Sequence, residues 1–171
     1  MLFRSEAFYG GATFDGTLYK ATLDDPTAEL YLPPGVDGRG RPDGRTEAVG
    51  MNVDDEGRLY VSGGSSGNVY VYDIETRELV ATLSTGPGGF INDVTIADNG
   101  DVYFTDSATS NPARHVIWRA TEEQVEEGGG APEAIPLAPE VPWQPGFNAN
   151  GIRAVNDGGD DDEDEDDDDD G

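Results

Sequence analysis

Residues 91–107 read INDVTIADNGDVYFTDS and hold the pattern on which the fold depends. An apolar strand that begins at an Asn-Asp pair leads into an Asp-Asn-Gly turn, and a second strand of aliphatic and aromatic residues follows. Short runs of Val, Ile, Tyr and Phe bounded by Asn, Asp and Gly are typical of β-hairpins. The stretch therefore predicts two antiparallel strands joined by a tight turn.

The same pattern occurs elsewhere in the chain. Residues 48–64 read AVGMNVDDEGRLYVSGG and align with residues 91–107 at an offset of 43, with the turn glycines and the tyrosines of the second strands in register. Residues 150–158 read NGIRAVNDG and align with residues 92–100 at an offset of 58. These similar segments predict a fold built from repeated units.

Each complete unit is predicted to contain four strands. After the first hairpin the chain continues as NVYVYDIETRELVATLSTG, residues 68–86, which reads as two further strands joined by a polar turn. A helical pattern is confined to residues 121–130, with Thr121 as its N-cap. Four-stranded antiparallel units that recur at roughly 40 to 50 residues are typical of β-propeller blades. We therefore predict an all-β fold, an incomplete β-propeller of about three and a half blades.

Composition and charge limit the partners of the protein. The 171 residues are 35% hydrophobic and contain no apolar run long enough to cross a bilayer, so no membrane partner is expected. The net charge of −26 would repel a phosphate backbone, which argues against nucleic acid as a partner. Nine of the ten basic residues are arginines, and an acidic, lysine-poor composition suits a halophilic protein that stays soluble in concentrated salt.

The chain divides into a body and a tail. Residues 157–171 carry twelve acidic residues and no apolar one, so we predict a disordered acidic tail there and one partial propeller domain in residues 1–156. Cysteine is absent, which excludes disulfides, thiolate nucleophiles and sulfur-ligated zinc. Residues 1–20 lack the apolar core of a signal peptide, so the cytoplasm is the default compartment.

Propeller geometry brings two asparagines towards one point. The first strand of each blade is innermost, and its start opens onto the central channel. Asn92 and Asn150 occupy this position in their units, whereas Val49 occupies it in the preceding unit. Because amide oxygens suit a hard cation such as calcium, the two asparagines form a candidate metal site. Asparagine at the start of a strand also commonly satisfies a turn, and this alternative stays open.

Three stretches carry a resemblance to a known family. They read INDVTIADNGDVYFTDS, FNANGIRAV (residues 147–155) and DGTLYKATLDDP (residues 15–26). With them, most of residues 7–155 resembles the gluconolactonase and luciferin-regenerating enzyme family, of the senescence marker protein type. The resemblance implies a six-bladed propeller, one divalent cation on its axis, often calcium, and metal-dependent hydrolysis of a small-molecule lactone or ester.

The resemblance also implies roles for individual residues. Asn92 and Asn150 would be metal ligands, and Asp93 would lie beside the metal, where it could act as a base or nucleophile. By its position alone, Trp143 in the Pro-rich stretch before Asn150 is a candidate substrate contact at the channel mouth. Packing explains a tryptophan there equally well.

The chain departs from the family pattern at the remaining ligands. Family members usually bring a Glu ligand in a Pro-Glu-Gly segment of the first blade and an Asp ligand in a later blade, and the sequence matches neither; Glu6 is the only acid near the expected place of the Glu. Residues 4–23 read as the second and third strands of a blade without its innermost strand. The chain is therefore expected to be a fragment or to close a ring with other copies, with self-association through open blade edges.

Other functions are also compatible with a propeller. A nucleophilic pair of Ser107 and His115 is disfavoured, because the sequence has no Gly-x-Ser-x-Gly elbow to expose the serine. A non-catalytic propeller that acts as a binding or interaction scaffold is the alternative to an enzyme, because one fold hosts many functions. Calcium dependence distinguishes the two functions.

Overall fold

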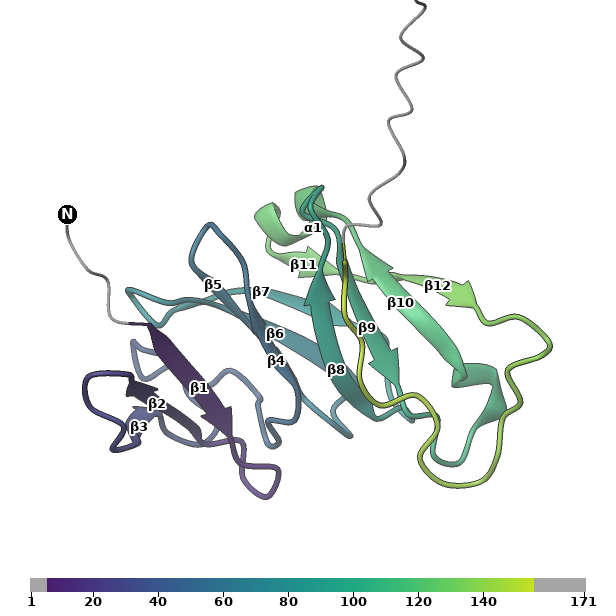
Figure 1. Ribbon diagram of the computed structural model, residues 1–171, viewed down its shortest axis with the longest axis horizontal. Helices are drawn as coiled ribbons and strands as arrows, with labels where there is room; N and C mark the ends of the chain where they lie inside the picture. Colours follow the sequence, from purple (N-terminus) through teal and green to yellow (C-terminus); the bar gives the residue numbers. More distant parts are fainter. Residues whose placement is uncertain (1–5, 156–171) are drawn as a thin grey trace, which may run out of the picture.

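The computed structural model describes residues 6–155, which form an all-β protein of three sheets (Figure 1). We call these the first, middle and last sheet. The first sheet contains β1 (Ala7–Gly11), β2 (Leu18–Thr22) and β3 (Glu29–Leu32). The middle sheet contains β4 (Met51–Val53), β5 (Arg58–Ser62), β6 (Asn68–Asp73), β7 (Leu79–Ser84) and β11 (Gly129–Gly130). The last sheet contains β8 (Ile91–Ile96), β9 (Val102–Asp106), β10 (Val116–Ala120) and β12 (Glu133–Pro136).

The strands of each sheet pair mostly in chain order and antiparallel. The order is β1-β2-β3 in the first sheet, and β4, β5, β6 and β7 follow one another in the middle sheet. In the last sheet β12 takes the edge beside β10. Among the described strands only β11 pairs in parallel, along the outer edge of β7. The prediction of an antiparallel all-β fold is confirmed, while the assignment of these sheets to propeller blades stays a prediction.

The repeat found in the sequence is present in the pairing of the strands. In the hairpin of β4 and β5, Asn52 lies opposite Tyr60, and in the hairpin of β8 and β9 the equivalent residues, Thr95 and Tyr103, lie opposite each other. The turn glycine has a φ of 82° in the first hairpin and 79° in the second, a left-handed conformation that glycine adopts without strain. The two hairpins are therefore repeats in register as well as in sequence.

The position of β1 differs from the prediction. β1 lies against β4, and β4 lies against β8, so the first strands of the three sheets are neighbours. Gly11 in β1 permits this approach, because a Cβ there would lie 2.6 Å from the Cβ of Ala48. The expectation that residues 4–23 supply the second and third strands of a unit is therefore wrong for β1, which occupies the place of a first strand.

The short helix is confirmed. α1 (Glu122–Glu126) begins at Thr121, whose hydroxyl accepts a hydrogen bond from the N–H of Gln124, while the Gln124 side chain accepts one from the N–H of Thr121. This reciprocal capping box satisfies backbone donors that a helix start leaves unpaired. A 3₁₀ turn, η1 (Pro112–Arg114), precedes β10.

The middle sheet is buried on both faces. One apolar cluster joins it to the first sheet, and a second cluster joins it to the last sheet. Side chains along β5 point alternately to the two faces of the sheet. Leu59 and Val61 therefore lie in the cluster shared with the first sheet, and Tyr60 lies in the cluster shared with the last sheet. The first and last sheets each contribute one face to a cluster, so their other faces point away from the stack.

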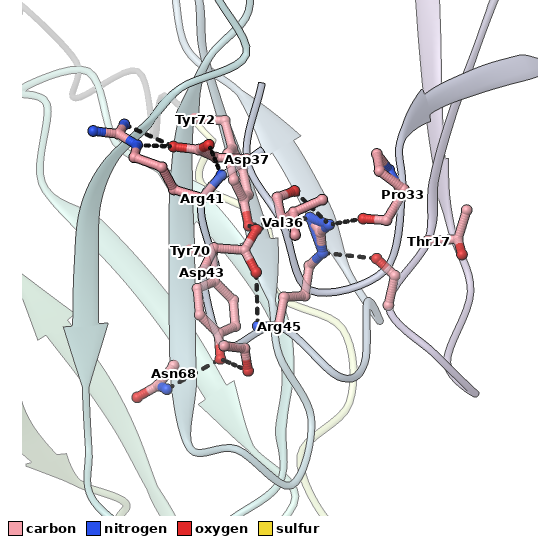
Figure 2. Close-up of polar contacts among 12 residues, drawn as sticks. Thr17, Pro33, Val36, Asp37, Arg41, Asp43, Arg45, Asn68, Tyr70 and Tyr72 are labelled. Atoms are coloured by element: carbon pink, nitrogen blue, oxygen red, sulfur yellow. Dashed lines mark hydrogen bonds and ion pairs between the residues drawn. The ribbon is translucent and has the colours of Figure 1, made fainter. Parts of the chain in front are cut away.

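The connection from β3 to β4 is built around a buried arginine (Figure 2). Arg45 is 1% exposed, and it donates hydrogen bonds of 2.7 Å to the carbonyl oxygens of Gly16 and Pro33. Its Nη1 atom donates to the hydroxyl of Tyr72 (3.1 Å) and lies 3.6 Å from Oδ2 of Asp43. Because Gly16 belongs to the first sheet's hairpin and Tyr72 to β6, this one side chain joins the two sheets.

Asp37, in the same connection, is expected to make stability depend on pH. Its carboxylate accepts hydrogen bonds from Nε (3.0 Å) and Nη2 (2.7 Å) of Arg41, and chiefly for this reason its pKa is lowered from 3.8 to about 2 (Figure 2). A lowered folded-state pKa contributes stability above the unfolded-state value, and this contribution is lost as the pH falls towards the folded-state value. We expect Asp37→Asn to lower the urea midpoint near neutral pH, and the difference from wild type to shrink between about pH 4 and about pH 2.

The control for this prediction is Asp55→Asn, at an exposed turn position of the β4–β5 hairpin. This variant is expected to follow the wild-type pH profile. A difference between Asp37→Asn and wild type that stays constant over the acidic range would contradict the role of the carboxylate.

Two sequence predictions concern the limits of the described chain. The acidic tail predicted at residues 157–171 lies outside the described residues. Within residues 6–155, no helix is long and apolar enough to cross a membrane.

Candidate functional site

The segment of residues 148–154 runs beside β8 and is held there by side chains of the last sheet (Figure 1). Four side chains each bond one backbone group of the segment. The hydroxyls of Ser107 and Thr105 donate 2.7 Å hydrogen bonds to the carbonyl oxygens of Ala149 and Asn150, respectively. The Asp93 carboxylate accepts a hydrogen bond from the N–H of Ile152 (3.1 Å), and the Thr95 hydroxyl accepts one from the N–H of Ala154 (2.9 Å). Residues that are far apart in sequence therefore lie side by side at this edge of the last sheet.

Asn92 lies at the start of β8. Its Nδ2 atom donates a 2.9 Å hydrogen bond to the hydroxyl of Ser107, and its carbonyl oxygen accepts a 2.8 Å hydrogen bond from the N–H of Gly50. The Ser107 hydroxyl is buried and is the same group that holds the oxygen of Ala149. With its nitrogen engaged, Asn92 would offer a cation its Oδ1 atom.

Asp93 lies between Gly50, which precedes β4, and the segment of residues 148–154. Its Oδ1 atom accepts a 2.9 Å hydrogen bond from the N–H of Val94, and its Oδ2 atom accepts the hydrogen bond from Ile152. Gly50 makes room for the carboxylate, because a Cβ at that position would overlap Asp93 Oδ1. The carboxylate is therefore fixed in place by two backbone donors.

Asn150 is held in place through its backbone. Its carbonyl oxygen is bound by the Thr105 hydroxyl, and its residue surface is exposed. The same hydroxyl accepts a 3.2 Å hydrogen bond from the N–H of Asp93. One hydroxyl thus joins the backbone of Asp93 to that of Asn150, and Asn92 directly precedes Asp93 in the chain.

Glu47 lies close to the start of β8, although no motif in the sequence marks it as a candidate ligand. Its Oε2 atom accepts hydrogen bonds from the backbone N–H and from the hydroxyl of Ser65, the latter at 2.6 Å. A Cβ at Gly64 would overlap this carboxylate, and Gly64 exchanges two 3.0 Å backbone hydrogen bonds with Ile91. Because Ile91 directly precedes Asn92, Glu47 brings an acidic side chain to the region of the predicted ligands. Glu6, the acid nearest to the place expected from the family pattern, is an exposed residue before β1.

Trp143 is held by the fold. Its Nε1 atom donates a 2.8 Å hydrogen bond to the carbonyl oxygen of Ala108, and the residue is half-buried. Asn148 organises the surrounding loop, because its Nδ2 atom donates to carbonyl oxygens of Ser107, Gln144 and Gly146. These contacts give Trp143 an anchoring role, and contact with a substrate stays a prediction.

The arrangement gives no support to a nucleophilic pair of Ser107 and His115. The Ser107 hydroxyl is buried and donates to Ala149. His115 instead lines a cavity of about 380 Å³, whose walls are largely apolar. The neighbouring Asp106 is also structural, because it is fully buried and accepts a 2.7 Å hydrogen bond from Arg114.

The donor chemistry near the start of β8 suits a hard cation. Glu47, Asn92 and Asn150 would offer one carboxylate and two amide oxygens, and calcium prefers oxygen ligands, typically about six to eight of them. Among residues 6–155, no group of three or more His, Cys, Asp and Glu side chains is placed to hold a metal ion, so the amides, backbone carbonyls and water would have to complete the shell. No protein-family model and no curated protein sequence matches this chain.

Proposed function

We propose that the protein is a gluconolactonase-like β-propeller protein whose activity is the metal-dependent hydrolysis of a lactone or ester. The antiparallel order of the sheets, the repeated hairpins and the adjacent first strands support the propeller part of the proposal. The observation that carries the proposal is that the Thr105 hydroxyl bonds the backbone oxygen of Asn150 and the Asp93 carboxylate bonds the N–H of Ile152, so that the segment bearing Asn150 is held beside the strand that begins at Asn92.

The proposed ligands are Glu47, which precedes β4, Asn92, at the start of β8, and Asn150, in the segment beside β8. A bound divalent cation, with calcium as the best match to these oxygens, would polarise the substrate carbonyl. Asp93 would accept a proton from the attacking water, the ring or ester C–O bond would break, and the proton would pass to the departing oxygen. The two backbone hydrogen bonds to Asp93 hold its carboxylate in position for this role.

Calcium titration tests the proposed ligands. We expect isothermal titration calorimetry of the full chain to show a saturable calcium site, and Asn92→Ala or Asn150→Ala to weaken its affinity at least roughly tenfold, because each removes a ligand oxygen. Asn99→Ala, in the turn at the other end of β8, is the matched control and should keep wild-type affinity. All variants carry the same acidic tail, so binding by the tail does not distinguish them.

Hydrolysis tests the proposed role of Asp93. With calcium present, we expect the full chain to open unsubstituted lactones or cleave p-nitrophenyl esters, and Asp93→Asn to lower the rate by roughly a hundredfold or more, as for the loss of a general base. Proton release in a pH-stat measures the lactone reaction. A chain that shows neither the calcium site nor hydrolysis would overturn the proposal.

A non-catalytic scaffold is the second candidate function. The observation that favours it is that Asp93 and the Ser107 hydroxyl bound by Asn92 hold the segment of residues 148–154 against the sheet. In that case Asp93→Asn would lower thermal stability, and wild-type protein with bound calcium would hydrolyse no substrate. The hydrolysis readout separates a scaffold from an enzyme, because Asp93→Asn removes the same structural contacts in either case.

A further inference from the structure

Ser107 has a buried hydroxyl that the proposed hydrolysis does not use. The residue directly follows Asp106, where β9 ends, and it is 0% exposed. Its hydroxyl donates a 2.7 Å hydrogen bond to the carbonyl oxygen of Ala149 and accepts one of 2.9 Å from Nδ2 of Asn92. One hydroxyl therefore contacts both the proposed ligand at the start of β8 and the segment of residues 148–154.

The direction of these two hydrogen bonds follows from the number of protons available. A serine hydroxyl has a single proton to donate, and a backbone carbonyl oxygen can only accept. Because the Ser107 proton is used by the carbonyl oxygen of Ala149, only the lone pairs of the hydroxyl remain for the side chain of Asn92. An amide donates to a lone pair only with its nitrogen, so Oδ1 of Asn92 has to point away from Ser107.

The backbone of Ser107 is held from both sides. Its N–H donates a 2.8 Å hydrogen bond to the carbonyl oxygen of Phe90, which lies two residues before Asn92. Its own carbonyl oxygen accepts hydrogen bonds from the N–H (3.0 Å) and from Nδ2 (3.1 Å) of Asn148. The hydroxyl therefore has a fixed place relative to both the start of β8 and the segment that bears Asn150.

We propose that Ser107 is a positioning residue of the calcium site, and that its hydroxyl turns the amide of Asn92 so that Oδ1, and not Nδ2, is available to the cation. This inference rests on the proposed calcium site and adds what orients one of its ligands. An asparagine side chain that is free to rotate presents either its oxygen or its nitrogen, and only the oxygen binds calcium. Hydrogen bonds to a ligand from outside the metal shell orient it, and their loss typically lowers metal affinity by about ten- to a hundredfold.

The hydroxyl of Thr105 makes similar hydrogen bonds but to different groups. It donates to the carbonyl oxygen of Asn150 and accepts a hydrogen bond from the backbone N–H of Asp93. A backbone N–H has no second orientation, whereas a side-chain amide has two. Of these two hydroxyls, the one of Ser107 therefore selects the orientation of a ligand, and the one of Thr105 only holds the backbone.

A double-mutant cycle, measured by isothermal titration calorimetry of the full chain with calcium chloride, tests the role of Ser107. We expect Ser107→Ala to lower the calcium affinity of the otherwise wild-type chain roughly tenfold or more. In the Asn92→Ala background the same substitution should change the affinity by less than about twofold, because the amide on which the hydroxyl acts is gone. Thr95→Val is the matched control, since it removes another buried hydroxyl that holds the same segment, through the N–H of Ala154, and should keep the wild-type affinity.

Three results would overturn the inference alone, provided that circular dichroism shows folded variants and that Asn92→Ala still weakens binding. Ser107→Ala could bind calcium like wild type, it could lower the affinity equally in both backgrounds, or Thr95→Val could lower the affinity as much as Ser107→Ala. The last two results would mean that the hydroxyl only keeps the segment in place. A wild-type chain without a saturable calcium site would instead overturn the proposed function and this inference together. Ser107→Cys repeats the test should Ser107→Ala fail to fold, because a thiol is only a weak acceptor.

Discussion

Replacing Arg45 by alanine should lower the free energy of unfolding by about 3–5 kcal/mol, because removal of one partner from a buried ion pair leaves the other charge uncompensated. The stranded partner is Asp43, whose side chain is as buried as that of Arg45. The carbonyl oxygens of Gly16 and Pro33 would lose their guanidinium donors, and Tyr72 would lose the cation that lies 5.3 Å from its ring centre. Urea unfolding followed by tyrosine and tryptophan fluorescence measures the loss.

The control for Arg45 is a surface arginine in the same connection. Arg39 is largely exposed and pairs with Glu78, so Arg39→Ala should change the stability by no more than about 0.5 kcal/mol. Arg45→Lys should recover little of the loss, because a lysine cannot donate in several fixed directions as a guanidinium does. Equal losses for Arg39→Ala and Arg45→Ala would show that the buried contacts of Figure 2 do not stabilise the fold.

Replacing Asp106 by alanine should also destabilise the protein by about 3–5 kcal/mol, since it leaves the buried Arg114 without its counter-charge. Asp106 Oδ1 accepts 2.9 Å hydrogen bonds from the N–H groups of Phe90 and Ala108, and Oδ2 accepts the hydrogen bond from Arg114 Nε. These contacts fix the entry to β8 and the exit from β9. The same unfolding experiment measures this loss.

Asp98→Ala supplies the comparison for Asp106. Asp98 is an exposed residue in the turn between the same two strands, so its removal should change the stability by no more than about 0.5 kcal/mol. Asp106→Asn should fall between the two, because an amide oxygen still accepts hydrogen bonds but carries no charge. If Asp106→Ala unfolds at the wild-type urea concentration, Asp106 has no structural role of this kind.

The parts of the fold that the sequence predicts are the local ones. The hairpin in residues 91–107 is visible from alternation and its turn glycine, and the helix at residues 122–126 is visible from the cap at Thr121. The place of β1 beside β4 and the pairing of Gly129 with β7 depend on contacts between distant segments, which local patterns do not encode. Glycines that end a helix and glycines that join a sheet edge look alike in a sequence.

The residues of the candidate site also differ in how far the sequence alone predicts them. The repeat in the sequence predicts equivalent positions for Asn92 and Asn150, but in the structure Asn92 lies in β8, whereas Asn150 lies in a segment that forms no strand within the described residues. Glu47 is different, because it precedes β4 and reaches the site through Ser65 and Gly64, in a loop of another hairpin. Arg45 in its Gly- and Pro-rich stretch reads as a solvated residue, and its burial depends on partners such as Tyr72 that lie 27 residues away.

The attachment of residues 148–154 to β8 consists of side chains that bond backbone groups. A ladder of main-chain hydrogen bonds persists through most changes of residue, whereas this attachment changes with single substitutions at Thr95, Thr105 or Ser107. Evolution can therefore adjust how firmly the segment bearing Asn150 is held, step by step, while the hairpin beside it keeps its own pairing.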